Sequence, residues 1–467
     1  MPQVYFTNED TVAAIATPPG EGGIAVIRIS GRDAISILEQ VFKREGEKNI
    51  KDMKSHRFYK GHIVGTNSTV IIDSILCVLM KSPHSYTGED VAEIHCHGGY
   101  LVPKKILNLL FNHGVRPARP GEFTLRAFMN GRMDLAQAEA VADVVKAQTD
   151  ESLKQAELHL EGVLSSRIHE FKEIVLDALA EIEAQVDFPE EDIDPIIREE
   201  IIQRIAELIN RMKGLLSTFE EGRILKHGVS TAIIGKPNVG KSSLLNQLLM
   251  KERAIVSPTP GTTRDFIEEA IDIRGIPIRL VDTAGLRATA DEVEKVGVVL
   301  ANKKADEAEL IIALVDGSAP LDSDDHEVLN RIKNRKAVLA INKSDLSQKT
   351  SEITLFNFIL KDKTVKTSAK LGSGIEELKD LIHDILLGNK KSMDGTEVII
   401  SELRHKVAIQ TARDNLVEFL KSFEKGESPE FLAVSLRSSL ASLGEITGET
   451  TTEDILGRIF SKFCIGK

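Results

Sequence analysis

Residues 235–242, Gly-Lys-Pro-Asn-Val-Gly-Lys-Ser, constrain the fold of this 467-residue chain more than any other segment. They follow a stretch with strand character, STAIIG, and precede one with helical character, SSLLNQLL. In such a strand–loop–helix the loop N–H groups bind phosphate oxygens, the lysine neutralises the β and γ phosphates, and the serine hydroxyl binds Mg²⁺. We therefore predict a P-loop nucleotide site with Lys241 at the phosphates and Ser242 on the metal.

Short apolar strands alternate with helical stretches throughout residues 229–388, which is typical of a doubly wound parallel sheet. The expected strands are STAIIG, IRLVDTAG, ELIIALVD, KAVLAINKSD and TVKTSAK. The P-loop therefore belongs to an α/β domain.

Later segments in this region supply the base and metal contacts. The carboxylate of Asp282, in Asp-Thr-Ala-Gly, can hold the Mg²⁺ shell, and a hydroxyl of Thr262 or Thr263 can complete the coordination. Asp345, in Asn-Lys-Ser-Asp, can accept from N1–H and the exocyclic amine of guanine, a donor pair that adenine lacks. Ser-Ala-Lys at 368–370 closes the base pocket through backbone N–H. We therefore predict GTP as the nucleotide.

The residues predicted to contact GTP, from these motifs or, for Ser257 to Gly261, from the family resemblance given below, are Asn238, Val239, Gly240, Lys241, Ser242, Ser243, Ser257, Pro258, Thr259, Pro260, Gly261, Thr262, Thr263, Asp282, Thr283, Ala284, Gly285, Asn342, Lys343, Asp345, Ser368, Ala369 and Lys370.

One position departs from the Ras-type arrangement. Leu286 follows Asp-Thr-Ala-Gly, where a water-positioning glutamine would be expected, and leucine cannot orient a nucleophile. Glu294 is a candidate for holding the water; the alternative is a solvated acidic loop. The side-chain carbonyl of Asn238 is a candidate ligand for a monovalent cation beside the phosphates.

The composition of the chain bears on its binding partners and its cellular environment. A formal net charge of −12 argues against coating nucleic acid by bulk attraction, although a local basic patch could still bind RNA. Three cysteines form no disulfide framework, so a reducing cytosol is expected, and no apolar run is long enough for a membrane span.

Three successive kinds of residue pattern along the chain predict a multidomain protein with α/β and all-α parts. Residues 1–118 are rich in strand patterns, and residues 119–218 read as long helices. Helical texture returns in residues 396–467. We predict one discontinuous helical domain, 119–218 with 396–467, into which a nucleotide domain, 219–395, is inserted; two separate helical domains are the alternative.

The whole chain resembles a known family, the tRNA modification GTPases MnmE, also called TrmE. The resemblance rests on ATPPGEGGIAVIRISG (16–31), SYTGEDVAEIHCHGG (85–99), RPGEFTLRAFMNGRMDLAQAEAV (119–141), the P-loop region and the terminal Phe-Cys-Ile-Gly-Lys. Generic P-loop GTPases lack these flanking segments.

The resemblance implies an N-terminal α+β domain that forms a homodimer and binds 5-formyl- or methylene-tetrahydrofolate. The matching positions are Arg28, Glu93, Arg132 and Lys467. Cationic partners suit the folate carboxylates, and an acceptor carboxylate suits the pterin. Many family members have lysine at the position of Arg132.

The resemblance also implies GTP hydrolysis stimulated by potassium. Asn238, Ser257, Thr259 and Thr262 match its K⁺-binding elements, Ser242 and Thr263 the Mg²⁺ ligands, and Glu294 the water-orienting glutamate. Lys241, Thr263 and Glu294 are thus the catalytic candidates of this site.

Cys464 lies in the family's terminal Cys-x-Gly-Lys motif and is a candidate nucleophile toward uridine; the alternative is a small buried residue. Glu93, His95 and His97 alternate on one predicted strand, and a polar pocket wall is favoured over a metal site.

The implied function is the addition of a carboxymethylaminomethyl or aminomethyl group to C5 of the wobble uridine, position 34, of certain tRNAs. The partner would be a flavoprotein of the MnmG/GidA type carrying FAD, in a heterotetramer or larger assembly, in the cytoplasm. Two alternatives remain: a ribosome-assembly GTPase of the Era/EngA kind, and a folate-regulated switch that leaves tRNA unchanged.

Overall fold

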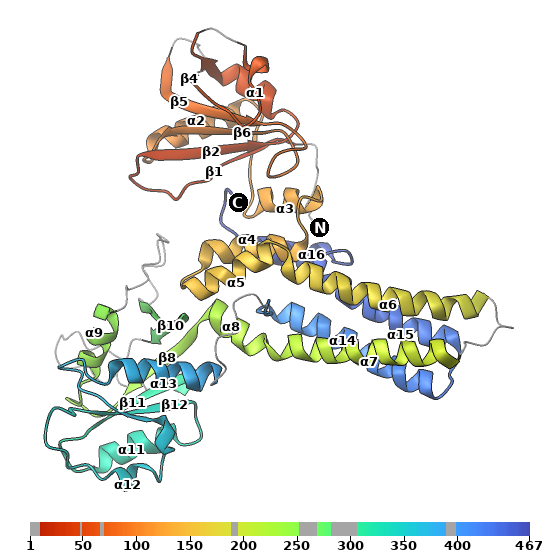
Figure 1. Ribbon diagram of the computed structural model, residues 1–467. Helices are drawn as coiled ribbons and strands as arrows, with labels where there is room; N and C mark the ends of the chain where they lie inside the picture. The colour runs from red at the N-terminus through yellow and green to blue at the C-terminus, as the bar shows by residue number, and fades with distance from the viewer. Residues whose placement is uncertain are drawn as a thin grey trace. The chain divides into compact units, whose positions relative to one another are not determined.

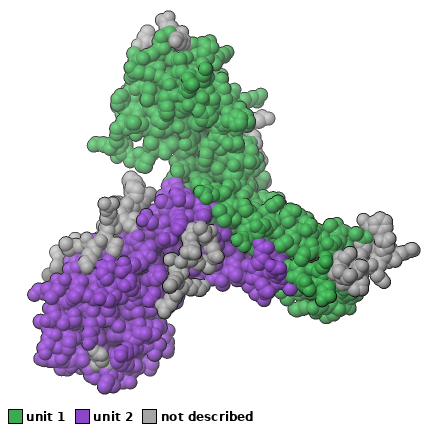
Figure 2. All heavy atoms as spheres, viewed as in Figure 1, with its two compact units in different colours: residues 1–142, 159–205, 414–467 green, residues 143–158, 206–413 purple. Residues whose placement is uncertain are grey.

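The chain is described here by a computed structural model (Figure 1). It describes residues 10–46, 49–65, 70–187, 195–251, 269–281, 306–388 and 398–467. Two compact units are distinguished in Figure 2: unit 1 comprises residues 1–142, 159–205 and 414–467, and unit 2 comprises residues 143–158 and 206–413. Within the described residues, no helix combines the length and apolarity that crossing a bilayer requires. The three-domain division stays a prediction.

Unit 1 begins with a seven-stranded sheet of order β3-β4-β5-β6-β2-β1-β7. Neighbouring strands are antiparallel except for the short parallel pair β1 and β7. The strands are β1 Val12–Ile15, β2 Ile24–Ser30, β3 Phe42–Arg44, β4 Phe58–Val64, β5 Ile71–Met80, β6 Val91–His97 and β7 Arg116–Pro117.

One face of this sheet is covered by two helices, α1 (Ala34–Val41) and α2 (Leu101–Asn112). Side chains alternate between the faces of a strand, so Ile27 and Ile94 point into the core beneath these helices. Arg28 and Glu93 lie on the opposite face, directly across from each other in the ladder.

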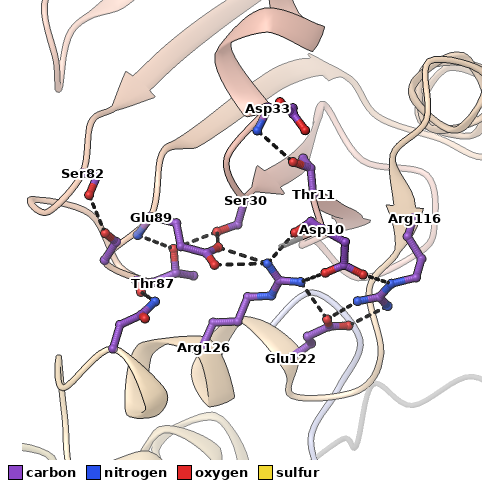
Figure 3. A network of polar contacts seen from close by, with 12 residues as sticks. Asp10, Thr11, Ser30, Asp33, Ser82, Thr87, Glu89, Arg116, Glu122 and Arg126 are labelled. Atoms are coloured by element: carbon purple, nitrogen blue, oxygen red, sulfur yellow. Dashed lines mark hydrogen bonds and ion pairs between the residues drawn. The ribbon is translucent and has the colours of Figure 1, made fainter. Parts of the chain in front are cut away.

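The short helix α3 (Glu122–Met129) is fixed to this sheet by a network of charged side chains (Figure 3). Arg126 is only 6% exposed and donates to Asp10 Oδ1 (2.7 Å), Glu122 Oε1 (3.0 Å) and both oxygens of Glu89 (3.2 Å). Arg116 pairs with Asp10 and Glu122 from the other side. Burial raises the pKa of Glu122, but its hydrogen bonds from the two arginines and from the Arg119 N–H outweigh this and lower the pKa overall.

Long helices make up the remainder of unit 1, several of which continue into unit 2. In Figure 1 α6 lies alongside α15, and Arg437 of α15 pairs with Glu183 of α6 at 2.6 Å. The helices wholly in unit 1 are α6 Val163–Asp187, α15 Pro429–Thr447 and α16 Glu453–Phe460. Those divided between the two units are α4 Leu135–Lys146, α5 Asp150–Leu160, α7 Pro195–Ser217 and α14 Leu403–Glu424, and the short helix α8 Phe219–His227 belongs to unit 2.

Unit 2 contains a six-stranded sheet of order β13-β12-β11-β8-β10-β9. Five strands are parallel and coincide with the five apolar stretches predicted from the sequence, whereas the edge strand β9 is antiparallel and was not predicted. The strands are β8 Val229–Ile234, β9 Glu269–Ile273, β10 Ile276–Val281, β11 Leu310–Asp316, β12 Ala337–Asn342 and β13 Thr364–Lys366.

Helices cover both faces of this sheet, as expected of a doubly wound fold. One core cluster joins the sheet to α8, α9 and α13 through residues such as Leu244 and Ile382. The cluster on the other face joins it to α11 and α12 through residues such as Leu329 and Leu355. These helices are α9 Lys241–Lys251, α11 Ser323–Ile332, α12 Glu352–Leu355 and α13 Ile375–Leu387.

The chain segments that enter and leave this sheet meet at what we call the neck, formed by residues 218–226 and 400–402. The Ile400 N–H donates to Thr218 Oγ1 at 3.2 Å, across a sequence separation of 182 residues. A Cβ on Gly222 would lie 2.3 Å from the Ile400 oxygen, so only glycine allows this approach. Lys226 pairs with Glu402 on the same side.

Candidate functional site

The P-loop joins the end of β8 to the first residue of α9, as the sequence predicts. Asn238 adopts a left-handed conformation with φ +60°, which asparagine tolerates better than most residues. Gly240 has φ +107°, and a Cβ there would meet Asn342 Nδ2 at 2.2 Å. The loop conformation thus depends on these residue types.

The side chain of Lys241, the first residue of α9, reaches back to the start of the loop. Its Nζ donates to the carbonyl oxygens of Gly235 (2.7 Å) and Lys236 (2.9 Å). Burial lowers the pKa of Lys241 below the ordinary lysine value. An ammonium that is partly removed from water and held, within the described residues, by two carbonyls suits an anionic ligand such as a phosphate.

Asn342, at the end of β12, connects the P-loop to the base-binding segments. Its Nδ2 donates to the Val239 oxygen at 2.7 Å, and its Oδ1 accepts from the Ala369 N–H at 2.9 Å. Ser368 Oγ donates to Asp345 Oδ1 at 2.6 Å, and this hydrogen bond lowers the pKa of the exposed Asp345 carboxyl. Asp345 is therefore an ionised acceptor, the form that guanine recognition requires.

The structure brings three of the predicted GTP segments together: the P-loop, Asn-Lys-Ser-Asp and Ser-Ala-Lys. Ser242 and Ser243 lie exposed in the first turn of α9, and Lys370 is exposed beside the base-binding segments. Predicted residues outside the described part of the chain are Ser257, Pro258, Thr259, Pro260, Gly261, Thr262, Thr263, Asp282, Thr283, Ala284, Gly285 and Glu294, together with Leu286.

A second site surrounds Arg28 in unit 1. Arg28 Nε donates to Glu93 Oε1 at 2.9 Å, and its guanidinium lies 5.5 Å from the ring centroid of Tyr86 and 5.6 Å from that of Phe123. Such distances are within the range of cation–π attraction. Lys467 is close enough that burial, first, and the positive charge of Arg28, second, lower its pKa. Two basic side chains, one carboxylate and two aromatic rings thus form one group, which we call the Arg28 cluster.

Of the four residues predicted to bind folate, three lie close together in the Arg28 cluster, and the fourth is Arg132. Arg28, Glu93 and Lys467 come together, and the C-terminal tail lies against this cluster, where Arg28 donates to the Gly466 oxygen at 3.4 Å. Arg132 is exposed, and its stem lies against Gly88 in the loop that carries Tyr86.

Sequence reasoning did not identify Tyr86 and Phe123, although both lie in segments that carry the family resemblance. Among the described residues, no three histidine, cysteine, aspartate or glutamate side chains are grouped to hold a metal ion. His95 instead packs edge-on against Phe58, with 5.0 Å between ring centroids, as part of the sheet face.

The three cysteines differ in exposure. Cys464 is exposed, so its interpretation as a small buried residue is wrong, whereas Cys77 and Cys96 are buried in the sheet. Burial raises the pKa of Cys77 and brings that of Cys96 to about 11. A thiol with that pKa is ionised in only about 1 molecule in 1,000 at pH 8.

We therefore expect iodoacetamide at pH 8 to alkylate Cys464 and to leave Cys77 and Cys96 at least about 100-fold less modified, because thiolate and access are both required. Peptide mass spectrometry of the native protein measures this directly, and unfolded protein provides the control. Similar labelling of all three residues would contradict the burial described here.

Comparison with known proteins bears on both sites. The model of the GTP-binding protein TrmE N-terminus matches residues 11–132, and that of the MnmE helical domain matches residues 135–464. The tRNA modification GTPase MnmE of Geobacter metallireducens is 46% identical over 98% of this chain and 99% of its own length. This chain belongs to the MnmE family. The counterparts from Geobacter sulfurreducens and Clostridioides difficile are 47% and 45% identical, each over 98% of this chain and 99% of their own length.

Membership of the MnmE family confirms the resemblance on which the sequence interpretation relied. It also confirms the fold class, with an N-terminal α+β part, helices and an α/β nucleotide-binding part. Era of Aquifex aeolicus bound to GDP and AlF4⁻ is 29% identical over 40% of this chain and 66% of that chain, with a TM-score of 0.26.

Proposed function

We propose that this chain hydrolyses GTP and takes part in the modification of tRNA. The GTP assignment rests on the two hydrogen bonds of the Asn342 side chain, which donates one to the P-loop and accepts one from the Ala369 N–H. Together with the ionised Asp345 acceptor beside Ser368, they support phosphate-binding and guanine-binding groups in one site. The names of the relatives, tRNA modification GTPase MnmE, support tRNA as the target.

In this proposal GTP binds with Mg²⁺ on Ser242 and Thr263, and Lys241 neutralises the phosphates. Asn238 would help to hold K⁺, and Glu294 would orient the attacking water. The side-chain amide of Asn238 carries a carbonyl oxygen, a hard donor that suits an alkali cation, which supports the K⁺ assignment. Thr263 and Glu294 lie outside the described residues.

The Arg28 cluster would bind a reduced folate as the one-carbon donor. A guanidinium, an ammonium at Lys467 and one carboxylate at Glu93 suit the charges and the hydrogen-bonding edge of such a ligand. Tyr86 and Phe123 add aromatic surface against which a flat ring can pack. A homodimer formed through this part of the chain remains part of the proposal.

The proposed reaction is the addition of a carboxymethylaminomethyl or aminomethyl group at C5 of the wobble uridine, carried out in the cytoplasm with an FAD-containing partner of the MnmG/GidA type. Nucleoside analysis of tRNA from cells lacking this chain tests it. Loss of the C5-substituted wobble uridines is expected. Unchanged nucleosides with intact GTP hydrolysis would instead favour an Era/EngA-like role or a folate-regulated switch.

The cation assignment has its own test. We expect the full chain to hydrolyse GTP at least about 10-fold faster in potassium chloride than in sodium chloride at equal ionic strength, because a fitted cation offsets charge that develops on the phosphates. An Asn238→Ala variant should lose the difference between the salts. Equal rates for the unmodified chain in both salts would remove Asn238 from this role.

A further inference from the structure

The side chain of Lys236, the second residue of the P-loop, pairs with two carboxylates that lie outside the loop. Its Nζ lies 2.7 Å from Asp322 Oδ2 and 2.6 Å from Asp325 Oδ2, and its side chain is only 15% exposed. Both aspartates belong to the start of α11, 86 and 89 residues along the chain. The side chain therefore points away from the phosphate side of the loop and fastens the loop to a neighbouring helix.

The two aspartates are themselves held in place. Asp322 is the N-cap of α11 and accepts from the N–H groups of Asp324 (3.1 Å) and Asp325 (3.0 Å). Asp325 Oδ2 accepts in return from the Asp322 N–H at 3.2 Å, which completes a capping box. The hydrogen bond from Lys236 is the main cause that lowers the pKa of Asp322 to about 2. The lysine thus pairs with two carboxylates that the capping box holds in position.

The main chain of the same residue faces the nucleotide side. The Lys236 carbonyl oxygen accepts from Lys241 Nζ, the group that we assign to the β and γ phosphates. One residue therefore has its side chain anchored to α11 and its carbonyl in contact with the phosphate-binding lysine. A shift of the anchor would move this carbonyl.

The segment between β11 and α11 is also bound to the guanine motif. At its other end Asp316 Oδ2 pairs with Lys343 Nζ at 2.7 Å, and the Gly317 N–H donates to the Asn342 oxygen at 2.9 Å. Residues 316–325 therefore connect the base-binding motif to the P-loop, and we call this segment the brace. The shape of the P-loop and the position of the guanine motif are thus tied to one stretch of chain.

We propose that Lys236 is a positioning residue for GTP, which holds the P-loop in its nucleotide-binding shape through the brace. This inference rests on the proposed GTP function. The loop contains three positions with positive φ, Gly235, Asn238 and Gly240, a conformation that a free chain adopts only part of the time. If the contact between Lys236 and the brace, which we call the tether, is lost, a smaller fraction of the molecules has the P-loop in its nucleotide-binding shape. The apparent Kd for the nucleotide then rises in proportion.

A set of variants can separate an effect of Lys236 on nucleotide affinity from an effect on folding stability. Lys236→Met keeps the aliphatic stem but leaves Asp325, which is 2% exposed, without its cation. The double variant Lys236→Met/Asp325→Asn removes that uncompensated charge and still lacks the tether. Lys236→Arg keeps both charge and reach. Lys333→Met, an exposed residue at the far end of α11, is the matched control.

For the full chain we expect Lys236→Met to weaken GTP and GDP binding about 10-fold and to raise KM more than it lowers kcat. Lys236→Arg should bind within about 3-fold of the unmodified chain, and Lys333→Met should match it. The double variant should recover thermal stability but keep the weakened affinity. Calorimetric titration with each nucleotide, alongside a thermal melt, measures both quantities.

Three outcomes would overturn the inference: nucleotide affinity unchanged in Lys236→Met, affinity that returns together with stability in the double variant, or tighter binding in Asp325→Asn alone. The last would mean that Lys236 acts only through its charge, since this variant keeps the lysine and weakens its tether. If the unmodified chain itself binds no GTP, the proposed function fails rather than the role of Lys236.

Discussion

Replacing Asp345 with asparagine should change the preferred base of this chain from guanine to xanthine. The carboxylate accepts two hydrogen bonds from guanine, and asparagine offers one acceptor and one donor in its place. Xanthine carries a carbonyl where guanine carries its exocyclic amine, so the side-chain amide of the introduced asparagine would find a matching acceptor. We expect GTP affinity to fall on the order of 100-fold and XTP to become the better ligand.

Titrations of the unmodified chain and the variant with GTP, XTP and ATP measure this exchange. Ser368→Ala is the informative companion, because it removes the 2.6 Å hydrogen bond to Asp345 but leaves the carboxylate. This variant should lower the affinity for GTP by only about 5-fold and should not bind XTP in preference to GTP. If Asp345→Asn binds GTP and XTP as the unmodified chain does, the guanine assignment of Asp345 is wrong.

Removing the guanidinium of Arg126 should destabilise the junction between α3 and the N-terminal sheet by about 3–5 kcal/mol. Arg126 pairs with Asp10, Glu89 and Glu122 (Figure 3). After its replacement by methionine, Arg116 would still pair with Asp10 and Glu122, whereas Glu89 would lose its ion pair with Arg126. Native-state hydrogen exchange of amides in β1 and α3 reports this local free energy.

Arg437→Met is the matched control for this measurement. Arg437 is 63% exposed and pairs with a single carboxylate, Glu183, so its loss should cost less than about 1 kcal/mol. Equal protection losses in the two variants, or no loss in Arg126→Met, would show that the network does not hold α3 on the sheet.

The sequence predicted the five parallel strands of unit 2 because each is an uninterrupted apolar run, the pattern of a strand buried on both faces. It missed β9, where Glu269 and Asp272 interrupt the apolar residues without a regular alternation. This edge strand has only one neighbour, β10, and its polar positions resemble those of a loop.

The nucleotide motifs could likewise be predicted because each lies within a few consecutive residues. The bond from Lys236 to Asp325 could not, since it joins residues 89 positions apart and no periodicity connects them. The same holds for Tyr86 and Phe123 around Arg28, which come from a loop and a helix that meet only in the folded sheet domain. Local chemistry is readable from sequence, whereas partners brought together by topology are not.

The neck has a consequence for how the chain tolerates change in length. Its contact between Thr218 and Ile400 closes a loop of about 180 residues, and the entropy of closure grows only with the logarithm of loop length. Doubling or halving the chain between these residues would alter that entropy by only about 0.6 kcal/mol. Another compact domain whose ends lie equally close could therefore replace the enclosed segment, while residues 218–226 and 400–402 kept their mutual contacts.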